Sequence, residues 1–264
     1  MTVEPEPMTA KEVAAPRSVE LWLVDLARSG PALERQERDA PRLGRRDRAG
    51  IEALKPADAR QQRLTAHLAL RVLLERHLGR AVRGLDLARA QGGKPGLPEG
   101  WGPFDFSLAH VEAAALIGVT RGAAIGVDLE VVRAVRIAGE RRRRILAAGA
   151  ALIPSEGIHG MSEAEAFMRA WVRLEALAKA RGEGLQRTLT ALGLRHAGAG
   201  AAREVVLGVQ RHLSLTGLSV HDLALGAGRV AAVALDQTLG LPPLNAFPVD
   251  SAGIEALLRG RNSG

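Results

Sequence analysis

Hydrophobic residues follow two spacings along this chain, one typical of strands and one typical of helices. Apolar runs interleaved with polar residues predict strands at 19–27, 104–110, 113–120, 121–132, 203–215, 218–226 and 229–235. An apolar face that recurs every three to four residues predicts a helix over 57–79, with Gly79 at its end. The clearest helix begins at Ser162, which forms a capping box with Glu165, and it ends at Gly182.

These elements predict an α+β fold of two similar α/β halves in a pseudo-twofold arrangement, with antiparallel sheets. The N-terminal half is expected over 18–122 and the C-terminal half over 123–236. Residues 1–17 are expected to form a disordered leader, and 237–264 a tail with one short helix at 252–259. Residues 30–56 predict short helical pieces at most, whereas 138–152 predict a helix.

Composition narrows the class of protein. Of the 264 residues, 47% are hydrophobic, which is enough for a packed core, and there is no cysteine. Disulfides, thiolate catalysis and cysteine-ligated zinc are therefore excluded. The N-terminal segment lacks the apolar stretch of a signal peptide, and no apolar run approaches the roughly 18 residues of a membrane span. We expect a soluble, cytoplasmic protein without a membrane partner.

The net charge of +7 indicates an acidic partner. Aromatic residues make up only 3% and tyrosine is absent, which disfavours nucleic acid because stacking platforms are scarce. The run of four arginines at 141–144 lies on a predicted helix, where consecutive side chains point in every direction. Such a run predicts a solvated helix end, or a docking surface for an acidic helix.

Two carboxylates, Asp128 and Glu130, stand one residue apart on a predicted strand and so point to the same side. A metal ion, a basic side chain or water at an exposed strand end would each relieve their repulsion. The helix that begins at Ser162 carries a stripe at four-residue steps, formed by Phe167, Trp171, Glu175 and Lys179. This stripe predicts either a surface Glu–Lys pair beside a core tryptophan or, with the strand pair, a carboxylate set that could hold Mg²⁺.

These motifs together resemble the 4′-phosphopantetheinyl transferases, of the long single-chain type that activates surfactin synthetase. "GVDLE" followed by "FMRAWVRLEALAKARGEGL" is similar to that family's signature, and "GGKPGLP", "FSLAH" and "RLTAHLALRVLLERHLG" are similar to its upstream segments. The resemblance covers roughly residues 19–236. Two positions depart from the pattern: Ala109 stands where the family has serine before its histidine, and Leu174 where it has lysine before its glutamate.

The resemblance implies transfer of the phosphopantetheine arm from coenzyme A to a serine of an acidic acyl- or peptidyl-carrier protein. It implies that Asp128, Glu130 and Glu175 hold Mg²⁺, that Glu175 accepts the serine proton, and that Lys179 meets the charge on the leaving phosphate. It further implies that coenzyme A is bound by His110, Lys94, Arg63 and Arg71. Arg71 can equally extend from the core, and Arg46 and Arg48 are vaguer candidates.

Two other hypotheses stay open. One is an arginine-rich nucleotide- or nucleic-acid-binding protein without enzymatic activity, and the other is a catalytically weakened paralogue that still binds coenzyme A. The carboxylates and the scarcity of aromatic residues favour the transferase without nucleic acid. Two halves in one chain predict a monomer. No role is assigned to His159, His196, His212 or His221.

Overall fold

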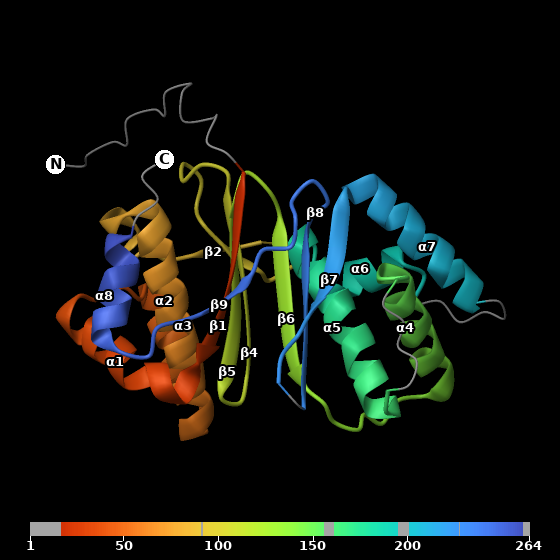
Figure 1. The fold of residues 1–264 in the computed structure, drawn as a ribbon, viewed down its shortest axis with the longest axis horizontal. Coiled ribbons are helices and arrows are strands. Elements are labelled where there is room, and N and C mark those ends of the chain that lie inside the picture. Colours follow the sequence, from red (N-terminus) through yellow and green to blue (C-terminus); the bar gives the residue numbers. More distant parts are fainter. Residues whose placement is uncertain (1–16, 91, 156–160, 195–200, 227, 261–264) are drawn as a thin grey trace.

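Two β-sheets lie face to face at the centre of the molecule, and helices cover their outer faces (Figure 1). This arrangement is seen in a computed structural model that describes residues 17–90, 92–155, 161–194, 201–226 and 228–260. The layers follow the order helices, sheet, sheet, helices. The predicted α+β class is confirmed. The predicted pseudo-twofold relation and the boundaries of the halves stay predictions, as does the leader, since residues 1–16 lie outside the described part.

The first sheet has the strand order β4-β5-β1-β9 and is mixed, because β9 runs parallel to β1 while the other pairs are antiparallel. Its strands are β1 (Ser18–Asp25), β4 (Phe104–Val111), β5 (Ala114–Arg121) and β9 (Leu244–Ala246). A short ribbon, β2 (Ala88–Arg89) with β3 (Pro95–Gly96), stands apart from it. The helices on its outer face are α1 (Leu26–Asp39), α2 (Arg45–Glu52), α3 (Ala57–Leu78) and α8 (Ser251–Arg259), with a 3₁₀ turn at Arg80–Val82.

The second sheet has the order β6-β8-β7 and is antiparallel throughout. Its strands are β6 (Ile125–Val131), β7 (Leu218–Leu223) and β8 (Arg229–Asp236). The helices beside it are α4 (Gly139–Leu152), α5 (Glu163–Arg181), α6 (Leu185–Ala191) and α7 (Ala201–Thr216). None of the helices in the described ranges combines the length and the apolar character needed to cross a bilayer.

Three apolar clusters fill the spaces between the layers. One lies between the first sheet and its helices, a second between the second sheet and its helices, and a third between the sheets. Ile125, Val127 and Leu129 belong to the third cluster, so these alternate residues of β6 face the first sheet. The alternating residues Gly126, Asp128 and Glu130 therefore share the opposite face, as the sequence predicts for the two carboxylates.

The structure overturns the strand predicted over 203–215, which is part of helix α7. Val205 and Val209 are buried one helical turn apart, and His212 continues that face. The valines favour a strand locally, but packing against α4 selects the helix. The sequence predicts at most short helical pieces over 30–56, and this prediction is wrong. Helix α1 runs for 14 residues and passes through Gly30 and Pro31, two residues that disfavour a helix.

The segment expected as a separate tail completes the first sheet and its helical layer. Leu244–Ala246 pairs with β1, and α8 packs on α1 and α3, with Phe247 and Ile254 buried in that core. The short helix predicted at 252–259 is confirmed as α8. The other strand pairs of this sheet are antiparallel, as predicted, and Leu244–Ala246 adds one parallel pair.

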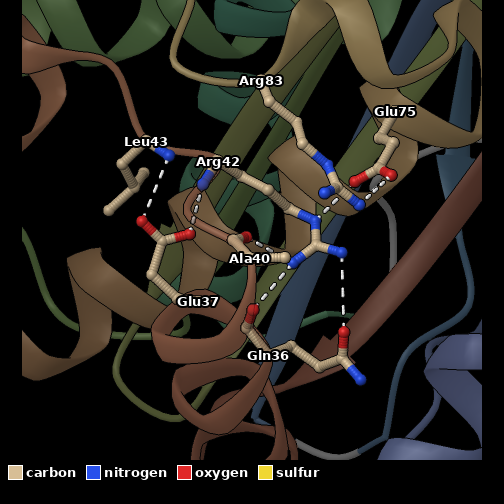
Figure 2. Close-up of polar contacts among 7 residues, drawn as sticks. All are labelled: Gln36, Glu37, Ala40, Arg42, Leu43, Glu75 and Arg83. Carbon is tan, nitrogen blue, oxygen red and sulfur yellow. Dashed lines mark hydrogen bonds and ion pairs between the residues drawn. The ribbon is translucent and has the colours of Figure 1, made fainter.

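A buried ion cluster joins α1 and the following loop to α3 (Figure 2). Arg42 donates from Nε to Glu75 at 2.6 Å and from Nη1 to the carbonyl oxygens of Gln36 and Ala40 at 3.0 Å. Arg83 binds the other oxygen of Glu75. Because the Arg42 and Glu75 side chains are each only 3% exposed, either group would be costly without its partner.

We predict that Glu75→Gln lowers the free energy of unfolding by about 3 kcal/mol, because it leaves Arg42 buried without a counter-charge. Urea denaturation monitored by tryptophan fluorescence measures this difference. Glu255→Gln is the matched control, since its pair with Arg259 is exposed and should contribute less than about 0.5 kcal/mol. Equal losses in the two variants would contradict the prediction.

Candidate functional site

The outer edge of β6 is bound by side chains rather than by another strand. Asp105 accepts the N–H of Ile125 at 3.0 Å, and Lys94 donates to the carbonyl oxygen of the same residue at 2.8 Å. Ser107 accepts the N–H of Val127 at 3.0 Å, while Lys179 of α5 donates to its carbonyl oxygen at 3.1 Å. β4, the loop between β2 and β3, and α5 thus fix the position of β6, the strand that carries Asp128 and Glu130.

Gly126 allows α5 to approach β6 closely. A Cβ at this position would overlap the carbonyl oxygen of Ala176 and the amide nitrogen of Ala180. Only a glycine leaves the space for this approach. The close packing brings Glu175 and Lys179 beside the carboxylates of β6, and Lys179 Nζ lies 2.7 Å from Asp128 Oδ1.

A second pair of glycines joins two of the sequence motifs. Gly92 donates its N–H to the carbonyl oxygen of Gly182 at 3.2 Å, and a Cβ on Gly92 would overlap the backbone of Gly184. The "GGKP" loop therefore packs on the turn after α5, where Gly182 adopts the left-handed conformation that ends the helix. A cavity of about 290 Å³ lies at this junction and is lined by residues that include Lys94, Ser107, Glu175 and Lys179.

The three predicted carboxylates lie close enough to influence one another. Burial raises the pKa of Asp128, although the Lys179 ammonium opposes this effect. Burial also raises the pKa of Glu130 and of Glu175, and the negative charge of Asp128 raises both further. This mutual repulsion favours any cation that enters the site.

These carboxylates do not form a ready-made metal cage, because no cluster of three or more Asp, Glu, His or Cys side chains in the described ranges encloses a common point. Asp128 Oδ2 is nevertheless buried without a hydrogen-bond partner, and Asp128 itself is only 7% exposed. Mg²⁺ commonly uses one or two protein carboxylates and completes its shell with water and substrate phosphates. The residues present therefore fit Mg²⁺, while the three-ligand set stays a prediction.

A basic cavity of about 340 Å³ lies between the two halves. Asp128, Glu130 and Lys179 form one side of it. The other basic side chains that line it come from α2, α3, β2 and β4, and they are Arg46, Arg63, His67, Arg89 and His110. Burial lowers the pKa of His110, and the neighbouring His67, Arg63 and Lys179 lower it further. Several cationic and hydrogen-bonding groups around one space suit a phosphorylated ligand.

Arg71, predicted to bind coenzyme A, is not among the residues that line this cavity. Its side chain is 1% exposed and binds Asp47 through Nε at 3.0 Å and through Nη2. Asp47 lies in the cavity wall, 3.6 Å from His67 Nδ1. Arg71 thus holds Asp47 rather than facing a ligand.

Lys94 is also engaged within the protein. Its ammonium binds both carboxylate oxygens of Asp105, at 2.6 and 2.8 Å, besides the carbonyl oxygen of Ile125. Burial lowers its pKa, and Asp105 opposes that effect. All three N–H groups have partners, so the structure gives Lys94 a positioning role, and direct contact with coenzyme A stays a prediction.

The sequence interpretation missed several residues of this region, among them Asp47 and Arg89 in the wall of the basic cavity. Asp105 and Ser107 alternate on β4 and both face β6, a spacing that the strand pattern contains. His67 lies one helical turn after Arg63, so the i,i+4 rule places both on one face of α3. Of the histidines left without a role, His212 and His221 do not line these cavities, and His159 and His196 lie outside the described residues.

Comparison with known proteins bears on the segment that carries the carboxylates. Residues 124–234 match the family model described as the 4′-phosphopantetheinyl transferase superfamily. Within these residues the chain is similar to that superfamily. Asp128, Glu130, Glu175 and Lys179 all lie within the matched segment.

A Synechocystis sp. protein named "Putative 4′-phosphopantetheinyl transferase" is 32% identical to this chain over 133 residues. The match covers 50% of this chain and 53% of the cyanobacterial protein, so this chain spans about half the length of that relative. The segment that matches the family model supplies Asp128, Glu130 and Lys179, the acidic side of the basic cavity. The arginines and histidines opposite it come from residues before 124, outside the family match.

We predict that Gly126→Ala lowers the free energy of unfolding by about 2 kcal/mol, because α5 must move away from β6 to admit the methyl group. Urea denaturation measures the change. Gly139→Ala, at the first position of α4 with no atom within 4 Å of the new Cβ, is the control and should be neutral or slightly stabilising. A neutral result for Gly126→Ala would show that the helix does not approach this closely.

A second prediction concerns Asp47. Burial alone would raise its pKa, but His67 and Arg71 outweigh burial and lower it from 3.8 to about 2. The ionised carboxylate therefore stabilises the fold above the unfolded-state pKa, and this contribution is lost as the pH falls towards 2. Asp47→Asn should lower the free energy of unfolding by about 2 kcal/mol at pH 7 and by about half as much at pH 3.

Urea denaturation at the two pH values tests the dependence on Asp47. Asp58→Asn, at the exposed start of α3, is the control and should change stability by less than about 0.5 kcal/mol. A loss for Asp47→Asn that is the same at pH 7 and pH 3 would contradict the ionised pair.

Proposed function

We propose that this chain transfers 4′-phosphopantetheine from coenzyme A to a serine of an acyl- or peptidyl-carrier protein, in the manner of the long single-chain transferases. The observation that carries the proposal is the position of Asp128, Glu130, Glu175 and Lys179. All four lie in the segment that matches the superfamily model, and Asp128, Glu130 and Lys179 line the basic cavity. The proposal includes the cytoplasmic location and the monomeric state expected from the sequence.

The basic cavity is the proposed site of the adenosine bisphosphate portion of coenzyme A. Arg63 and His110 supply hydrogen-bond donors from the N-terminal half, and Arg46 and Arg89 add positive charge. Because this wall and the carboxylates belong to different halves, a single chain supplies both sides of the site. This supports the single-chain type over one that needs a partner subunit.

In the proposed reaction the serine Oγ attacks the phosphorus that bears pantetheine, and the pyrophosphate P–O bond breaks to release adenosine 3′,5′-bisphosphate. Glu175 accepts the serine proton, directly or through a water. Lys179 stabilises the charge that develops on the leaving phosphate. Asp128, Glu130 and Glu175 would hold Mg²⁺, which neutralises pyrophosphate charge when bound.

The two departures from the family pattern leave this machinery in place. Leu174 is fully buried in the core beneath α5, one residue away from Glu175 on the helix. Ala109 packs between the sheets and lines the basic cavity with no polar side-chain atom. The position of Ala109 therefore favours weaker binding of the nucleotide over loss of the chemical step.

We predict that an apo carrier protein gains the mass of one phosphopantetheine when incubated with this protein, coenzyme A and Mg²⁺. Glu175→Gln should reduce the initial rate at least about a hundredfold, because it removes the base and a carboxylate oxygen. Chelation of divalent metal should abolish the gain, whereas Glu204→Gln, on the exposed side of α7, should leave the rate unchanged. Intact-mass spectrometry measures all three.

The outcomes separate the competing functions. If no carrier protein gains mass but the chain still binds coenzyme A, the chain is the catalytically weakened paralogue. Binding of nucleic acid that falls steeply with salt and needs no metal would assign the non-enzymatic alternative.

A further inference from the structure

Helix α3 carries a stripe of three basic side chains beside the basic cavity. Arg63, His67 and Arg71 follow one another at four-residue steps and therefore lie on one face of the helix. Arg63 and His67 line the cavity, whereas the Arg71 side chain is buried. Because like charges at this spacing repel, the stripe favours an anion beside it.

Asp47 of α2 supplies one negative charge to this stripe. Its Oδ2 accepts hydrogen bonds from Nε and Nη2 of Arg71, and its Oδ1 lies 3.6 Å from His67 Nδ1, which is buried without a hydrogen-bond partner. A carboxylate can only accept, so it favours a proton on Nδ1, and the other edge of the ring is left for the cavity. Arg71 thus fixes Asp47, and Asp47 orients the ring of His67.

One carboxylate does not balance the cations on this side of the cavity. Arg63 and Arg89 line it, and neither forms an ion pair with another residue that the structure describes. Burial lowers the pKa of His110 on β4, and the charges of His67 and Arg63 lower it further, so these three groups lie close together. Such a surplus of positive charge and N–H donors favours a phosphate.

The position of the carboxylates indicates which phosphate this would be. Asp128, Glu130 and Lys179 form one side of the cavity, and the pyrophosphate bond that breaks in the proposed reaction must lie beside them. The adenosine bisphosphate that is released carries a second phosphate on its ribose. With the pyrophosphate at the carboxylates, the ribose phosphate meets the other side of the cavity, which α3 and β4 form.

We propose that His67 binds the 3′-phosphate of coenzyme A, with Asp47 and Arg71 as its positioning residues, and this inference rests on the proposed function. The cavity edge of the imidazole donates an N–H to a phosphate oxygen, next to Arg63 and His110. His67 thereby supplies a donor to a cavity in which Ala109 has no polar side-chain atom. The contact makes the protein favour coenzyme A over 3′-dephospho-coenzyme A.

Isothermal titration calorimetry with these two ligands tests the inference. His67→Ala should weaken binding of coenzyme A about tenfold and change the Kd for 3′-dephospho-coenzyme A less than about twofold. His67→Gln keeps the bulk of the side chain and an N–H donor, so its loss should be smaller and again confined to coenzyme A. His221→Ala, on β7 away from the cavity, is the matched control and should leave both Kd values unchanged. An equal loss for both ligands, or no loss for either, would overturn the inference.

A double-mutant cycle tests the positioning role of Asp47. Asp47→Asn should weaken binding of coenzyme A about threefold when His67 is present, and less than about 1.5-fold when His67 is already alanine, because Asp47 acts through His67. The same loss in both backgrounds would show that Asp47 acts independently and would contradict its positioning role.

Transfer to an apo carrier protein separates this inference from the proposed function. If wild type modifies the carrier and His67→Ala does so with the same KM for coenzyme A, His67 has no such role and the function stands. A selective loss of affinity for coenzyme A in His67→Ala, without transfer by wild type, would keep the inference and contradict the transferase. If wild type binds neither ligand, both proposals are wrong.

Discussion

The site depends on how the exposed edge of β6 is satisfied. An edge strand presents unpaired N–H and C=O groups, and buried ones are costly when unbound. Here two N–H and two carbonyl groups of Ile125 and Val127 are bound by Asp105, Lys94, Ser107 and Lys179. Three of these side chains come from the N-terminal half and one from α5. The contact that holds the halves together is therefore also the contact that orients the carboxylate-bearing strand.

Lys179 takes part both in the packing of α5 on β6 and in the proposed chemistry. One ammonium group binds a carbonyl oxygen of β6 and a carboxylate of the same strand, and it also faces both neighbouring cavities. Its position follows from Gly126, where the absence of a side chain lets α5 lie against the strand. A lysine so placed gives Asp128 a counter-charge in the protein alone. It also answers the question posed by two like charges on one strand face, since a basic side chain stands beside them.

Local patterns were enough to predict the central strands, the two longest helices and the stripe from Phe167 to Lys179. They failed where tertiary packing overrules propensity, as in α7, whose valines favour a strand but face α4, and in α1, which continues through Gly30 and Pro31. For the site, the i,i+4 and alternation rules located the acidic residues. The partners of Arg71 and Lys94 lie on other elements, so the pairing of these cations with Asp47 and Asp105 required the fold.

The path of the chain also has a consequence for biosynthesis. β9 and α8 follow the C-terminal half in sequence, yet they pack against β1, α1 and α3. A nascent chain that has already emerged as far as β5 therefore lacks Phe247 and Ile254, two buried parts of its first core. Until those residues leave the ribosome, β1 keeps an open edge and the helical layer an apolar gap. The core around β1, α1 and α3 is thus completed only after the C-terminal half has been translated.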